Sequence, residues 1–145
     1  MGDPLIGERT RIIDATGLVL GRMASIVAKR LLNGENIIIV NAEKAVISGD
    51  KHTIIRGYHD YLQIGHPGKG PLHPRRPDRI VKRAVRGMLP YKQPRGRDAF
   101  RRLRVYMGIP LELRGKPMET IPEASANKLK CRYITIQDLS RHIQG

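Results

Sequence analysis

The first forty residues arrange apolar and polar positions in a way that predicts a strand, a helix and a second strand. Residues 11–17 form a short apolar run that ends in a turn, as a strand does. In residues 18–34 the apolar side chains recur at helical spacing, and the closing Asn-Gly pair is typical of a helix end. Residues 36–41 are a continuous β-branched run, which is typical of a strand buried on both faces. Together they predict a βαβ unit with parallel strands.

The rest of the chain predicts further helices and strands around irregular segments. Residues 51–64 have a helical pattern, with Ser48 or Asp50 as the expected cap. Residues 65–77 hold four prolines and three glycines, which exclude regular structure. The pattern predicts a loop over residues 91–97, a short helical turn over 98–102, strands over 103–108 and 132–136, a segment between them that is mostly loop, and a closing helix over 137–144 with Leu139 and Ile143 facing inward.

Residues 79–90 predict a helix with two different faces. One face is apolar and is formed by Ile80, Val81, Ala84, Val85 and Met88. The other face is wholly basic and is formed by Arg79, Lys82, Arg83 and Arg86. We expect Asp78 to cap this helix and Pro90 to end it. Because like charges at this spacing repel each other, the basic face needs a counter-charge from outside the helix.

These elements predict an α/β fold, a three-layer α/β/α sandwich on a four-stranded, mainly parallel sheet. The length of 145 residues suits a single domain that spans residues 1–145. We expect residues 66–102 to form a long basic insertion, rich in proline and glycine, within this domain.

The chain is strongly basic, with 27 Lys and Arg against 13 Asp and Glu, and its formal net charge is +14. The excess is concentrated in residues 66–106, where 13 cations face two carboxylates and leave a net charge of +11. Ten of these cations are Arg, whose planar fork suits phosphate groups. Such a segment favours a polyanionic partner, and the scarcity of aromatic residues favours folded RNA over single strands.

We therefore predict that the basic segment forms the RNA-binding site. Its predicted contact residues are Lys69, His73, Arg75, Arg76, Arg79, Lys82, Arg83, Arg86, Lys92, Arg95, Arg97, Arg101 and Arg102.

Other kinds of chemistry have little support in the sequence. Gly17 and Gly21 lie at a strand-to-helix turn, but their spacing does not match a dinucleotide-binding loop. The five histidines and the single Cys131 show no metal-ligand spacing, and the carboxylates are few and scattered. No apolar run approaches the length of a membrane span. We expect a cytoplasmic protein that is not an enzyme and has no cofactor, metal site, membrane contact or small-molecule substrate.

Residues 85–108, VRGMLPYKQPRGRDAFRRLRVYMG, resemble the signature region of the universal large-subunit ribosomal protein family thirteen (uL-thirteen). Residues 14–25, 40–51 and 108–112 extend the similarity, and the form resembles the archaeal and eukaryotic versions. The resemblance implies a structural constituent of the large ribosomal subunit, without catalytic residues. Its implied partners are large-subunit rRNA and neighbouring large-subunit proteins, and its implied role lies in early assembly. The alternative hypotheses are a free RNA-binding translational regulator, a nucleotide-using enzyme and, with less support, a DNA-binding protein.

Overall fold

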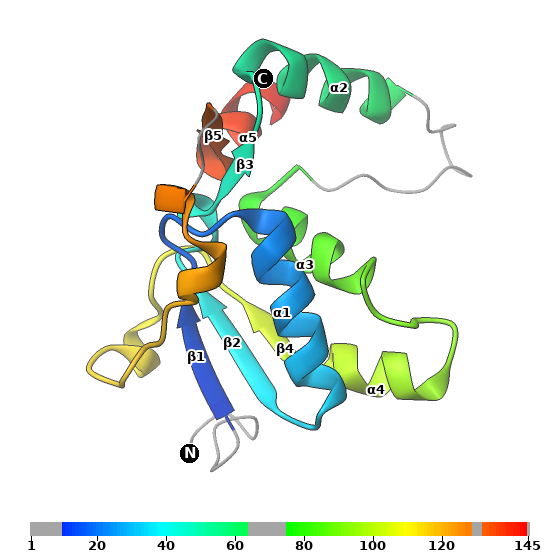
Figure 1. Cartoon of the computed structure of the whole chain (residues 1–145), viewed down its shortest axis with the longest axis vertical. Helices are drawn as coiled ribbons and strands as arrows, with labels where there is room; N and C mark the ends of the chain where they lie inside the picture. Colours follow the sequence, from blue (N-terminus) through cyan, green and yellow to red (C-terminus); the bar gives the residue numbers. More distant parts are fainter. Residues whose placement is uncertain (1–9, 64–74, 129–131, 145) are drawn as a thin grey trace.

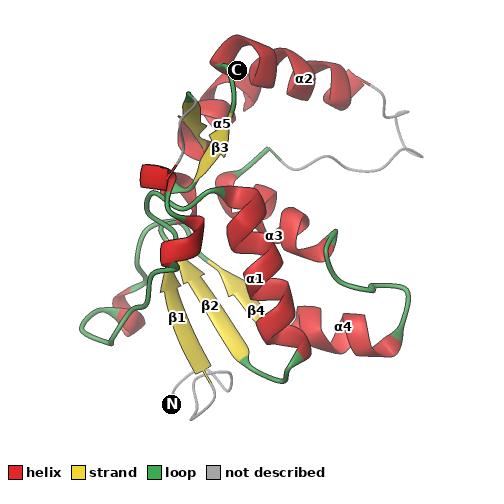
Figure 2. Cartoon of the chain, in the orientation of Figure 1, coloured by secondary structure: helices red, strands yellow, loops and turns green. Residues whose placement is uncertain are grey.

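A computed structural model of the chain describes residues 10–63, 75–128 and 132–144. Figures 1 and 2 show how its helices and strands are arranged. In chain order these elements are β1 (Thr10–Asp14), α1 (Leu20–Leu32), β2 (Asn36–Val40), β3 (Val46–Ser48), α2 (Lys51–Gln63), α3 (Pro77–Arg86), α4 (Pro94–Arg101), β4 (Leu103–Val105), β5 (Tyr133–Thr135) and α5 (Ile136–Gln144). None of the helices in these three ranges is long and apolar enough to cross a membrane.

The main sheet has three parallel strands in the order β1-β2-β4, with β2 in the centre. The β-branched run of β2 alternates between the two faces of the sheet. Ile37 and Ile39 join the larger apolar core, whereas Ile38 and Val40 join a smaller one on the opposite face. All four side chains are buried. The predicted parallel βαβ unit and the predicted strand buried on both faces are therefore confirmed.

Helices cover the face of the sheet that carries Ile37 and Ile39 (Figure 2). Helix α1 buries Met23, Val27 and Leu31 there, at the helical spacing that the sequence shows. Helices α3 and α4 pack beside α1 and contribute to the same core. The part of the predicted insertion that the structure describes, residues 75–102, is thus integral to the core.

The opposite face of the sheet is covered by an irregular segment, residues 106–118. Leu113 is buried there together with Ile12, Ile38 and Val40. A 3-10 turn over Leu111–Leu113 is the only helical element of this segment. Proline and glycine residues within the segment disfavour a longer helix. The prediction of an α/β fold with a mainly parallel sheet is confirmed, but the described residues place no α-helix on this face, where the predicted third layer would lie.

The prediction of four strands in one sheet is wrong for the described residues. Strand β5 pairs antiparallel with β3, and the two form a separate two-stranded sheet. Sequence reasoning did not predict strand β3. This sheet lies beyond the carboxyl ends of the main strands, together with α2 and α5 (Figure 1). Leu139 and Ile143 of α5 are buried, as predicted. Asp50 accepts hydrogen bonds from the Thr53 N–H and hydroxyl at 3.2 and 3.3 Å, which confirms it as the cap of α2.

Candidate nucleic-acid interface

Helix α3 begins and ends at other residues than the sequence suggested. Arg76 occupies the N-cap position and Pro77 the first helical position, where a missing N–H costs nothing. Asp78 lies in the first turn, and its carboxylate is 3.5 Å from the Arg76 guanidinium. The helix ends at Arg86, and Gly87 follows as its C-cap. The predictions that Asp78 caps this helix and that Pro90 ends it are therefore wrong.

The two faces of α3 are present as predicted. Ile80, Val81 and Val85 are buried against the core. Ala84 is half-buried, and Met88 departs from the prediction because it lies beyond the helix end and is 45% exposed. On the basic side Arg79, Lys82 and Arg83 are exposed, and Arg86 is half-buried. The apolar side anchors α3 on α1, and the anchored helix presents its cations outward.

Helix α4 adds a second row of cations. The sequence predicted a loop over residues 91–97, but Pro94 takes the first position of a helix that continues to Arg101. Gly96 permits this arrangement, because a Cβ atom there would lie 2.0 Å from the carbonyl oxygen of Pro90. Three of the predicted contact residues on α4 are exposed, namely Arg95, Arg97 and Arg101.

Some of these cations have partners within the chain. The Arg97 guanidinium donates a hydrogen bond to the Lys92 carbonyl oxygen at 3.2 Å. Arg101 lies 3.6 Å from the Asp98 carboxylate, in a pair that is largely exposed to solvent. Such exposed pairs are weak. They leave the guanidinium groups of α4 available to an external anion.

Two aromatic rings connect the cations of α3 to α4. The Lys82 ammonium lies 5.4 Å from the centroid of the Phe100 ring. The Arg86 guanidinium carbon lies 4.0 Å from the centroid of the Tyr91 ring. The two rings meet edge to face, with centroids 5.6 Å apart and an interplanar angle of 85°. Cation–π contacts of this kind restrict both cations. Sequence reasoning missed this cluster, because residues that are five, nine or eighteen positions apart across a turn give no periodic signal.

Arg102 differs from the other predicted contact residues. Its side chain is half-buried, and its guanidinium donates a hydrogen bond to the Leu31 carbonyl oxygen at the end of α1. A cation is favourable at that position, because the carbonyl groups of a helix end carry partial negative charge. The guanidinium of Arg102 therefore joins β4 and α1 within the fold.

Two further predicted contact residues lie just before α3. Arg75 and Arg76 are exposed, and the Arg75 carbonyl oxygen accepts a hydrogen bond from the Ser140 hydroxyl at 2.7 Å. This contact ties the residues before α3 to α5. Lys69 and His73 lie outside the described residues.

Helices α3 and α4 lie on the same side of the molecule (Figure 1), and most of the predicted cations belong to these helices and their connection. Residues 75–102 hold eleven cations and two carboxylates, a net charge of +9. Such a density of one sign attracts a polyanion and repels itself in its absence. We call the cations that α3, α4 and their connection expose here the basic face: Arg79, Lys82, Arg83, Arg86, Lys92, Arg95, Arg97 and Arg101.

The carboxyl ends of the parallel strands, where α/β proteins often bind ligands, hold a network of internal hydrogen bonds instead. One carboxylate oxygen of Asp14 accepts bonds from the Thr16 N–H, the Thr16 hydroxyl and the Asn41 amide at 3.0, 2.6 and 3.0 Å. Burial raises the pKa of Asp14, but the hydrogen bonds from Thr16 and Asn41 outweigh it and lower the pKa overall. The Glu43 carboxylate accepts the Gly108 N–H at 2.9 Å. Within the described ranges, no group of three or more His, Cys, Asp or Glu side chains is placed to hold a metal ion.

Comparison with known proteins places this fold and its basic face in a family. The model of the family described as "Ribosomal protein L13" matches residues 8–112, which include β1 to β4 and the whole basic face. The chain belongs to this family.

Relatives in the L13 family are similar over nearly their full length. A protein from Archaeoglobus fulgidus named "Large ribosomal subunit protein uL13" is 51% identical over 140 residues, which cover 95% of this chain and 90% of the relative. A protein of the same name from Methanococcoides burtonii is 52% identical over 91% of this chain and 96% of its own length. Another protein of this name, from Aeropyrum pernix, is 42% identical over 93% of this chain and 90% of its own length. The expected archaeal-like form of this family is thus confirmed.

Proposed function

We propose that the chain is a structural constituent of the large ribosomal subunit in the cytoplasm, where it binds large-subunit rRNA and supports early assembly. Membership of the L13 family, whose relatives carry the name of a large-subunit protein, supports this proposal. The family is structural rather than catalytic. Neighbouring large-subunit proteins are the other proposed partners.

The observation that carries the proposed rRNA contact is the basic face itself. Its cations stand on two helices whose other sides are buried in the core, so their spacing is set by the fold before any RNA binds. Pre-positioned arginine forks suit the phosphates of a folded RNA, because less side-chain freedom is lost on binding. Backbone contacts of this kind recognise the shape of an RNA rather than its base sequence.

The proposed site extends from the basic face to Arg75, Arg76, Lys69 and His73, all within the basic segment 66–102 of a single domain. We assign Arg102 a different role. Because its guanidinium binds the end of α1, it positions α4 and β4 and only supports the face indirectly.

A salt titration of rRNA binding tests the proposal. The variant Arg79→Gln/Arg95→Gln removes one exposed cation from each helix of the basic face and retains helix propensity. We expect weaker binding of the cognate rRNA fragment and a log–log salt slope that is shallower by about 1.5, since each lost phosphate contact contributes roughly 0.7–0.9.

The matched control is Arg22→Gln/Lys29→Gln, which removes two exposed cations from α1, outside the basic face. Its salt slope should change by less than about 0.5, as expected for cations that contact no phosphate. Equal losses of rRNA affinity in the two double variants would refute this placement of the site.

Sedimentation separates the proposed role from that of a free RNA-binding regulator, because a constituent co-migrates with the large subunit in amounts that match the rRNA.

A further inference from the structure

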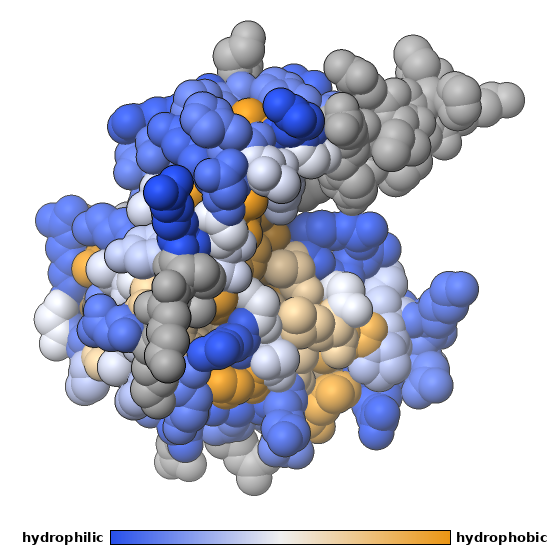
Figure 3. Space-filling model, turned by 45° about the horizontal axis from the view of Figure 1, so that its top comes forward, coloured by the Kyte–Doolittle hydropathy of each residue, from blue (hydrophilic) through white to orange (hydrophobic). Residues whose placement is uncertain are grey.

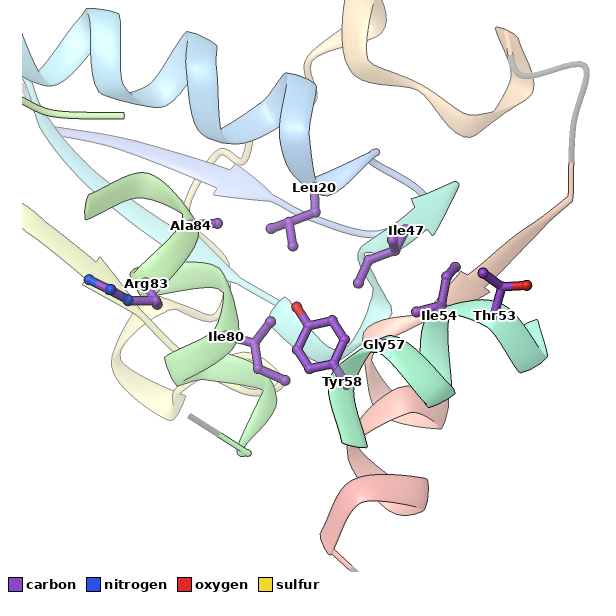
Figure 4. Close-up of a pocket in the computed structure, with 9 residues that line it drawn as sticks. All are labelled: Leu20, Ile47, Thr53, Ile54, Gly57, Tyr58, Ile80, Arg83 and Ala84. Atoms are coloured by element: carbon purple, nitrogen blue, oxygen red, sulfur yellow. The ribbon is translucent and has the colours of Figure 1, made fainter. Parts of the chain in front are cut away.

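A cavity with an apolar lining opens between α2 and the helices of the main body, next to the basic face (Figure 4). Its volume is 490 Å³, which is within the range of ligand-binding cavities. The lining residues come from α1, β3, α2 and α3: Leu20, Ile47, Thr53, Ile54, Gly57, Tyr58, Ile80, Arg83 and Ala84. In Figure 4 the Tyr58 ring points from α2 into the space between α2 and α3, toward Ile80.

The lining is mostly aliphatic. Leu20 and Ile80 are buried and form part of its floor, while Ile47, Ile54 and Tyr58 are half-buried on its walls. A second hollow shares Leu20, Ile47 and Tyr58 and continues past the start of α1. Figure 3 shows hydrophobic surface in the hollow below α2, bordered by hydrophilic surface. We call the two hollows together the α2 groove.

The rim of the α2 groove is cationic. Arg83 lines the first hollow and Arg22 the second, and no carboxylate is among the described lining residues of either. In Figure 4 the Arg83 side chain extends away from the cavity, on the side of α3 that carries the basic face. The groove is therefore continuous with the proposed rRNA interface, and its charge complements an acidic partner.

We propose that the α2 groove binds a short amphipathic segment of another large-subunit protein, in which one or two apolar side chains are flanked by Asp or Glu. The apolar side chains enter the cavity, and a flanking carboxylate meets Arg22 at the rim of the second hollow. This inference rests on the proposed function, because it places the partner on the same rRNA surface. An aliphatic cavity suits a protein side chain better than a nucleobase, whose buried donors and acceptors would lack hydrogen-bonding partners.

Photo-crosslinking in reconstituted large subunits tests the occupant. A diazirine side chain placed at Thr53, an exposed residue of the lining, reports what lies in the groove. We expect a crosslink to one segment of another subunit protein, with Asp or Glu within a few residues of the attached site. The control position is Ser25, an exposed residue of α1 outside both hollows, which should not give this crosslink. Crosslinks from Thr53 to rRNA, to this chain itself or to nothing would each overturn the proposal.

A variant pair then tests whether the groove itself is required. The variant Gly57→Leu adds a side chain at a groove position where a Cβ meets no atom within 4 Å, whereas Gly57→Ala leaves most of the space open. Both changes favour the helix. We expect the Gly57→Leu variant to lower the crosslink yield at least about tenfold, as for a blocked anchor pocket, and Gly57→Ala to lower it less than about twofold.

Binding of the isolated rRNA fragment distinguishes the two proposals. Both Gly57 variants should bind the fragment within about twofold of the unmodified chain, because the basic face is intact. Normal fragment binding together with an unchanged crosslink in the Gly57→Leu variant would overturn the groove proposal alone. Failure of the unmodified chain to bind rRNA would overturn the proposed function.

Discussion

The guanidinium carbon of Arg86 lies 4.0 Å from the centroid of the Tyr91 ring. A guanidinium that stacks on a ring keeps its N–H donors at its edge, where they remain available to phosphate oxygens. Tyr91 in turn meets Phe100 of α4 edge to face, so the stack belongs to a cluster that joins the two helices of the basic face. The contact with Tyr91 therefore restricts the Arg86 side chain and holds its N–H donors in place.

Replacing Tyr91 with Leu should therefore weaken rRNA binding without removing a phosphate contact. A cation–π contact at an exposed site contributes about 0.5–1 kcal/mol, so we expect affinity to fall about two- to fivefold while the salt slope is retained. In contrast, Arg86→Gln should lower the salt slope by about 0.7–0.9. The control is Tyr133→Leu, which alters an exposed tyrosine of β5 away from the basic face. A lower slope in Tyr91→Leu would contradict a purely positioning role.

Gly96→Ala should destabilise the fold more than its small size suggests. The added Cβ would lie 2.0 Å from the Pro90 carbonyl oxygen, so the backbone of α4 or of residues 90–91 must shift. Overpacking of this kind typically costs about 1–3 kcal/mol, and the displaced α4 should also weaken rRNA binding. Urea unfolding measures the first effect and the rRNA titration the second.

The matched substitution is Gly57→Ala on α2, where the new Cβ meets nothing within 4 Å. There the gain in helix propensity should raise the free energy of unfolding by up to about 1 kcal/mol. A lower free energy of unfolding in Gly96→Ala and a higher one in Gly57→Ala would support the close approach between Gly96 and Pro90. Equal effects in both variants would contradict it.

Ile39→Ala should cost about 2–5 kcal/mol of unfolding free energy, the usual range for truncating a buried isoleucine. Ile39 is fully buried in the larger core on the central strand β2. Leu111, which is 78% exposed, provides the control. Leu111→Ala should change the free energy of unfolding by less than about 0.5 kcal/mol, as surface substitutions usually do. An unfolding midpoint that Ile39→Ala leaves unchanged would refute the central position of this strand.

The elements with long periodic patterns could be predicted from the sequence. The strand pair β1 and β2, helix α1 and the two faces of α3 follow from apolar spacing alone, because each buries one stripe or face against the core. Of the short strands, β4 and β5 lie within the strands predicted over 103–108 and 132–136, whereas β3 was missed. Strand β3 has three residues, and the three residues of β5 do not indicate whether their partner lies in the main sheet or elsewhere.

Proline and glycine positions explain the other differences. Pro94 and Gly96 indicated a loop, yet a proline suits the first helical position and this glycine allows a close approach to Pro90. In the same way Pro77 takes the first helical position of α3, so the helix begins one residue before Asp78. These residues act through three-dimensional contacts that no local pattern contains.

The sequence predicted which segment carries the candidate site, but not how the side chains of that site are arranged. Charge density placed it on the cations between residues 66 and 106, and most of those described lie on the basic face. The sequence could not show that Arg102 binds the Leu31 carbonyl within the fold, because the two residues are 71 positions apart. It also could not show the α2 groove, which four separate elements enclose.

The hydrogen bonds that Asp14 accepts from Thr16 and Asn41 predict how the free energy of unfolding depends on pH. Hydrogen bonds from Thr16 and Asn41 hold the pKa of Asp14 below its ordinary value of 3.8, despite the opposing effect of burial. A carboxylate whose pKa is lower in the folded state contributes stability above its unfolded-state pKa and loses that contribution as the pH falls through the folded-state value. We therefore expect the free energy of unfolding to decline below pH 3.8 in part through this group.

Asp14→Asn should flatten that decline, because the amide does not titrate, and it should lower stability near neutral pH, where the charged hydrogen bonds are lost. Urea unfolding of both proteins at about pH 6 and about pH 3 measures the difference, which should be smaller at the lower pH. Asp98→Asn removes a charge of the same kind from an exposed position on α4 and serves as the control. An equal loss of stability in Asp14→Asn at both pH values would show that the network acts through packing and that its charge contributes nothing.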